Sequence, residues 1–84
     1  MPPSQAAEQG YALAQAGLGV MYDEGWGVQQ DYVHAHMWLS LAVEHGYETA
    51  KEGRDEVAAK MTPAQIAEAQ RLAREWVQSH PSTR

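Results

Sequence analysis

Histidine is the side chain of this sequence best suited to chemistry near neutral pH, and the chain has four. His34 and His36 lie two positions apart in a stretch with helical periodicity, so their rings point in different directions. No carboxylate stands four positions from either ring, and the chain has no cysteine. The pattern therefore predicts no metal site. It favours helix-surface or helix-end positions, with His45 near a helix C-terminus, where a positive charge is favourable.

Two adjacent acidic pairs, Asp23-Glu24 and Asp55-Glu56, are the other candidates for acid–base chemistry. A working pair needs a pocket that desolvates one member, and neither pair has apolar sequence neighbours that would build one. The sequence also lacks a serine elbow, a phosphate-binding loop and a zinc-protease motif. We therefore expect no catalytic residue and no cofactor, and we predict that the chain is not an enzyme.

The charge balance narrows the class of partner. The 84 residues include 11 acidic and 6 basic side chains, and the net charge of −5 disfavours phosphate backbones and anionic lipid surfaces. No apolar run approaches the ~20 residues that cross a bilayer, and the first residues do not have the pattern of a signal segment. Neither nucleic acid nor a membrane is expected as a partner. The compartment stays open: cytoplasmic or, within a longer precursor, periplasmic or secreted.

The composition and an internal repeat predict helical hairpins. Alanine, leucine, glutamine and glutamate are plentiful, isoleucine occurs once and phenylalanine never, so strands are not expected. The segment QAAEQGYALAQAG from Gln5 aligns with LAVEHGYETAKEG from Leu41, and each matched pair is 36 residues apart. Tyr11 matches Tyr47, and two glycine pairs match in the same register. A period in the thirties is typical of helical solenoids, in which stacked units share one core.

The first helix is predicted over Tyr11–Glu24, with residues 1–4 disordered. Gly17 and Gly19 each cost about 1 kcal/mol relative to alanine inside a helix, so both are interpreted as points where another helix comes close. Gly25 is expected to end the helix as a left-handed cap. In the connection that follows, Trp26 and Val28 are expected to fold back over the helix ends.

Three more helices are predicted. The second, Tyr32–His45, has Asp31 as its N-cap and is apolar nearly all round, so it should be the most buried element. The third, Glu48–Lys60, repeats the first with one face turned polar, as in a terminal unit that has no following neighbour. The fourth begins with a capping box of Thr62 and Gln65. Trp38 and Trp76 match at an offset of 38 and are interpreted as core residues.

These residues resemble the Sel-1-like repeat family, a relative of the tetratricopeptide repeats with a longer glycine-containing turn. The resemblance implies an all-α fold of about four helices, arranged as a right-handed superhelix of antiparallel helix pairs. Members are adaptor and scaffold proteins in signalling, bacterial host interaction and protein quality control, so the resemblance implies protein or peptide binding and no catalysis. The repeat framework is assigned to Ala14, Gly17, Leu18, Gly19, Tyr22, Gly25, Gly27, Val28, Asp31, Ala35, Trp38, Leu39, Ala42, Gly46 and Ala50.

The likeness also divides the chain. Residues 1–9 are interpreted as a tail and the remnant of a preceding repeat, 10–46 as a complete repeat, 47–79 as a degenerate C-terminal cap, and 80–84 as a disordered tail. The second unit has no counterpart of Leu18, Gly19 and Tyr22 of the first unit, and it lacks the glycine turn.

If the geometry follows the tetratricopeptide family, the inner face of the stacked first helices binds the partner. An apolar strip beside acidic side chains there would suit a peptide with an apolar anchor and basic flanks. The alternative is a structural role, in which the uncapped repeat end drives dimerisation or helix exchange. The resemblance places Leu13, Ala16, Val20, Asp23, Thr49, Glu52 and Glu56 on the inner face, and Trp26 is a further candidate contact in the turn.

Overall fold

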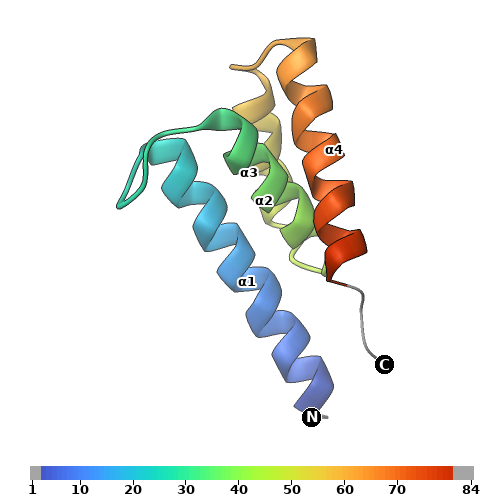
Figure 1. The fold of residues 1–84 in the computed structure, drawn as a ribbon. Helices are drawn as coiled ribbons and strands as arrows, with labels where there is room; N and C mark the ends of the chain where they lie inside the picture. The colour runs from blue at the N-terminus through green and yellow to red at the C-terminus, as the bar shows by residue number, and fades with distance from the viewer. Residues whose placement is uncertain (1–2, 81–84) are drawn as a thin grey trace.

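The computed structural model describes residues 3–80, with side chains from residue 11 onward, and this part of the chain contains helices and no strand. The predicted all-α fold is confirmed (Figure 1). None of these helices is long and apolar enough to cross a membrane. The four helices are α1 (Pro3–Glu24), α2 (Tyr32–Glu44), α3 (Ala50–Ala58) and α4 (Pro63–Ser79).

The helix α2 is the centre of the fold and packs against each of the other three helices. Its apolar residues occupy opposite sides, so it can bury two surfaces at once. One side joins α1 and α3 in a cluster built on Ala35 and Leu39, and the other joins α4 through Met37 and Leu41. Leu41 is fully buried, which is worth about 1.5–3 kcal/mol relative to exposure. The expectation that this helix is the most buried element is confirmed.

The helix α1 comes close to α2 at Gly19. A β-carbon at this position would lie 2.6 Å from Leu39 Cγ and 3.2 Å from the carbonyl oxygen of Ala35. Only glycine fits here, as the sequence predicted. The same prediction for Gly17 is wrong, because a β-carbon there would meet nothing within 4 Å. Gly17 lies on the exposed side of α1, away from α2.

The helix α1 is longer than predicted. It begins at Pro3 and continues through Gly10, so Ser4 is helical, and segment 5–9 is not separated from the helix that follows it. Proline is tolerated in a first helical turn, where its missing N–H has no helical partner to bond. Residues 1–2 and 81–84 lie outside the described part. The first turns of α1 extend past the ends of the other helices (Figure 1).

The turn between α1 and α2 follows the predicted glycine pattern. Gly25 and Gly27 have φ angles of 74° and 75°, the left-handed conformation in which a side chain would be strained. The backbone N–H of Asp31 donates to the Tyr22 carbonyl (2.9 Å), which closes the turn onto the end of α1. Trp26 does not fold back as predicted, because 61% of it is exposed.

Asp31 caps α2 as predicted, and its partner is His34. Its carboxylate accepts from the His34 backbone N–H at 3.2 Å and from the His34 ring Nδ1 at 2.7 Å. Burial raises the pKa of Asp31, but the hydrogen bonds from His34 outweigh burial and hold the pKa below its ordinary value of 3.8. Tyr22 stacks on the same imidazole, with 5.3 Å between ring centroids. The start of α2 is thereby tied to the last turns of α1.

The helices α3 and α4 complete the fold. α3 is shorter than the predicted Glu48–Lys60 segment, with Thr49 at its N-cap position but no side-chain cap hydrogen bond. α4 begins with the predicted capping box, in which Thr62 and Gln65 each accept from the backbone N–H of the other. The exposed Arg71 of α4 bonds to Glu68 and to Glu75.

The two glycines of α1 provide a matched test of the α1–α2 contact. Gly17→Ala should raise the free energy of unfolding by up to about 1 kcal/mol, because alanine favours the helix and meets open space. Gly19→Ala gains the same propensity but forces Leu39 and the α2 backbone away, at a cost of about 1–3 kcal/mol. In urea denaturation, Gly19→Ala should therefore be about 1–3 kcal/mol less stable than Gly17→Ala. Equal stability of the two variants would contradict the close approach at Gly19.

Candidate interaction surfaces

The exposed side of α1 carries an apolar stripe. Leu13 is 56% exposed and Val20 is 43% exposed, and their seven-residue spacing puts them on the same side of the helix. Gly17 lies between them and leaves a shallow space. Half-exposed aliphatic side chains that stand in line on one helix form a surface that a partner can cover.

The ion pair between Asp23 and Lys60 connects the end of α1 to the turn that follows α3. Lys60 Nζ lies 3.7 Å from Asp23 Oδ1, and the Asp23 side chain is 21% exposed. Glu52 and Glu56 are exposed and lie one turn apart on one side of α3. The exposed Thr49 precedes Glu52 by three residues, whereas Asp23 lies on the side of α1 that carries Ala16 and Gly19.

Two of the predicted contact residues differ from this pattern. Ala16 is only 7% exposed and belongs to the core with Ala35 and Leu39, so the prediction that it contacts a partner is wrong. It lies on the side of α1 that turns toward α2, where a small side chain permits close packing. Trp26 is exposed in the turn after α1 and is available to a partner.

The positions assigned to the repeat framework are buried in some cases and exposed in others. Ala35, Leu39, Ala42 and Ala50 are buried in one cluster, against which Tyr22 packs. Gly46 has a φ of 105° and follows the end of α2. Other framework positions are only half-buried or are exposed: Ala14 is exposed, and Leu18, Val28 and Trp38 are half-buried.

An aromatic cluster around Trp76 fastens α4 to the other helices. The Trp76 ring lies 6.0 Å from that of Trp38, edge to face, and 5.7 Å from that of Tyr11. It stacks on His80 at 4.2 Å. The ring of His45 lies 6.0 Å from that of Trp76, and its Nδ1 donates to Gln15 Oε1 at 2.8 Å. This cluster joins α1, α2 and α4 near the end of α2.

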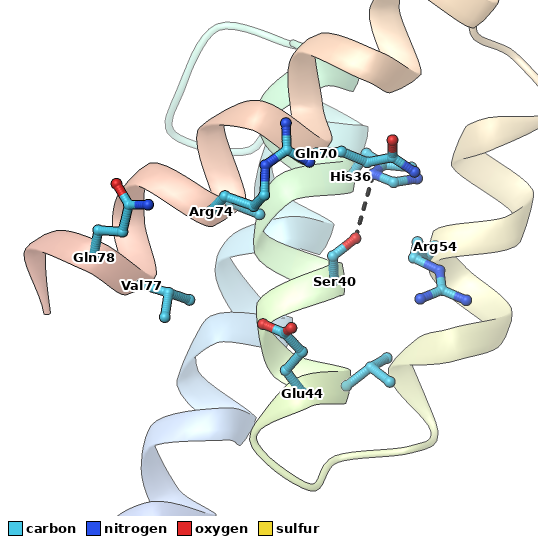
Figure 2. A pocket seen from close by; sticks show the side chains of 10 residues that line it. His36, Ser40, Glu44, Arg54, Gln70, Arg74, Val77 and Gln78 are labelled. Atoms are coloured by element: carbon cyan, nitrogen blue, oxygen red, sulfur yellow. Dashed lines mark hydrogen bonds between the residues drawn. The ribbon is translucent and has the colours of Figure 1, made fainter. Parts of the chain in front are cut away.

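A groove of about 700 Å³ lies between α3 and α4, with α2 as its floor (Figure 2). Four α2 side chains line the floor, Arg54 of α3 lines one wall, and five side chains of α4 line the other. Its volume is within the range of known ligand sites. Polar and charged residues supply much of the lining: His36, Ser40, Glu44, Arg54, Gln70 and Arg74.

His36 is the buried titratable group of this groove. It is 5% exposed, and its Nδ1 lies 3.3 Å from Ser40 Oγ (Figure 2). Burial lowers the pKa of His36, the positive charge of Arg54 lowers it further, and Asp55 opposes these effects. The imidazole is therefore neutral at physiological pH. Among residues 11–80, no three histidine, aspartate or glutamate side chains come close enough to hold a metal ion.

Comparison with known families accounts for the buried framework. Residues 12–47 match the sequence model of the family described as Sel1 repeat. This segment is a Sel1 repeat. Sel1 repeats are generally protein-interaction repeats and are typically non-catalytic. No curated protein matches the chain significantly.

The Sel1 repeat comprises most of α1, the glycine turn and all of α2, whereas the groove depends on α3 and α4 beyond it. The groove was not predicted from the sequence, because it depends on the spacing of α3 and α4 on α2. One signal was present. Arg54 stands where the repeat has Leu18, and a charged residue in place of a core leucine indicates a helix side that has turned away from close packing.

The buried His36 makes stability depend on pH. Its pKa is below the ordinary value of 6.5, so the unfolded chain takes up the proton first as the pH falls. This contribution to stability is therefore present above about pH 6.5 and is lost as the pH falls through the folded-state pKa. In chemical denaturation, the free energy of unfolding of the wild type should fall as the pH is lowered from about 7.5 to 5. In His36→Gln, the free energy of unfolding should depend less on pH over the same range.

The exposed His80 provides the control for this measurement. His80→Gln removes one histidine and leaves His36 intact, so this variant should keep most of the decline with falling pH. A wild-type curve and a His36→Gln curve of equal slope would show that His36 does not cause the decline.

Proposed function

We propose that this chain is a protein-binding module whose contact surface is the side of α1 that faces away from α2, together with the adjoining acidic flank of α3. One observation carries the proposal: Leu13 and Val20 stand exposed in line on the first helix of a Sel1 repeat. Their burial under a partner would each contribute about 1–2 kcal/mol, which is enough to anchor a peptide of modest affinity.

The charges beside the stripe indicate the kind of partner. Glu52 and Glu56 are exposed and lie one turn apart on α3. Neither has an ion-pair partner among the side chains described, while Asp23 is already paired with Lys60. A peptide with an apolar anchor for Leu13 and Val20 and with basic flanks for the two glutamates complements this surface.

Self-association is the second candidate function. The same exposed stripe of Leu13 and Val20 could be covered by a second copy of the chain. The first turns of α1 extend past the other helices, which leaves a length of helix that a second copy could pair with (Figure 1). In this role the chain would assemble with itself and would need no peptide.

Selection from a random displayed peptide library tests the first candidate. We expect enriched peptides to share one or two aliphatic or aromatic residues flanked by lysine or arginine. Leu13→Ser should weaken such a peptide about tenfold, and the charge reversals Glu52→Lys and Glu56→Lys together should weaken it by a similar factor. The matched controls are Ala67→Ser and Ala67→Lys, since Ala67 is exposed on α4, away from this surface.

Two outcomes would contradict this proposal. Peptides that are acidic, or that bind Leu13→Ser as well as the wild type, would show that the surface lies elsewhere. If no peptide is enriched and light scattering shows a dimer that Leu13→Ser dissociates, self-association is the function.

A further inference from the structure

The groove between α3 and α4 differs in charge from the rest of the molecule. Arg54 and Arg74 line it from α3 and α4 (Figure 2), and they are two of only six basic residues in a chain of net charge −5. Glu44 is the single acid of its lining. The groove is therefore a locally basic site on an acidic protein.

These two arginines make few ion pairs with other side chains of the chain. Arg74 has no ion-pair partner among residues 11–80. Arg54 has only the neighbouring Asp55, at a long 3.4 Å, and its side chain is 27% exposed. Arg71 is the contrast, because both Glu68 and Glu75 bond to it. A guanidinium without a protein partner can take a carboxylate in a paired hydrogen-bond geometry.

The rest of the lining suits the backbone of an extended chain. Gln70 and Gln78 are eight residues apart on α4, which places them ~12 Å apart along the helix. Each amide can both donate to and accept from a peptide group, and ~12 Å corresponds to about four residues of extended chain. Val43, Ala73 and Val77 add apolar surface between the polar groups. The neutral His36 and its neighbour Ser40 leave the arginines as the source of positive charge.

From this arrangement we infer that the groove between α3 and α4 binds an extended acidic segment of a protein partner. Arg54 and Arg74 bind carboxylates of the segment, and Gln70 and Gln78 bind its backbone. This site is separate from the proposed α1 surface and has the opposite charge. The helix α3 divides the two, with Glu52 and Glu56 on one flank and Arg54 on the other. The chain can therefore hold two partners of opposite charge at the same time.

Fluorescence anisotropy with a defined peptide tests this inference. The probe is a labelled peptide in which glutamate alternates with threonine, and its control has lysine in place of each glutamate. The glutamate peptide should bind saturably and more weakly as salt is raised, whereas the lysine peptide should not enter the groove. Arg74→Gln should weaken the glutamate peptide about tenfold.

Arg71→Gln is the matched control, since it removes the same charge from the same helix three residues away and outside the groove. It should change the affinity by less than about twofold, and circular dichroism should show both variants folded. If Arg74→Gln and Arg71→Gln lost affinity equally, the loss would be explained by net charge alone, and the groove would not be the binding site. The absence of saturable binding would also overturn the site, as would equal binding of the lysine peptide that persists when Glu52→Lys and Glu56→Lys remove the acidic flank of the α1 surface. Failure of the glutamate peptide to bind would leave the proposed α1 surface untested, because Leu13 and Val20 do not line the groove.

Discussion

The contact of Leu39 with Gly19 is the constraint on which the rest of the structure depends. Leu39 is 3% exposed and belongs to the cluster that joins α1, α2 and α3, and it occupies the space that any side chain at Gly19 would need. Because α1 lies this close, α2 is left with its opposite side free for α4. Gly19 thereby allows α2, a helix of 13 residues, to pack against all three of the other helices.

The central position of α2 also accounts for the two surfaces. The buried side of α1 carries Ala12, Gln15, Ala16 and Gly19, and the apolar Leu13 and Val20 remain exposed on the other side. The helices α3 and α4 each pack on α2, and the space left between them is the groove. The second unit lacks the tyrosine and the glycine turn of the Sel1 repeat, and it surrounds this groove with polar side chains. A short chain thus acquires an apolar and acidic surface on one side and a basic groove on another.

The sequence predicted the features that depend on local chemistry. The central α2 followed from apolar residues on every side, the start of α4 from its capping box, and the turn from Gly25 and Gly27. Tertiary contacts were less accessible. Gly17 and Gly19 cannot be told apart by residue type, and the rotation of α1 about its own axis decides that Gly19 faces Leu39 and Gly17 faces water. Helix continuity through Gly10 was missed for a similar reason, since a glycine costs a helix only about 1 kcal/mol. Part of the proposed surfaces could be predicted, because Leu13, Val20 and the glutamates of α3 follow from the repeat pattern. The burial of Ala16 and the presence of the groove could not, because both depend on how the helices pack.

Native-state hydrogen exchange of the wild-type chain tests most directly whether α2 holds the fold together. Amide protons from Leu39 to Ala42 should exchange only by global unfolding, with an opening free energy equal to that from urea denaturation. Amides of α4 should exchange through a smaller opening, because α4 packs mainly on α2 and can separate from it while the α1–α2 contact persists. Protection of α4 amides that equals or exceeds that of the α2 amides would contradict a fold organised around α2.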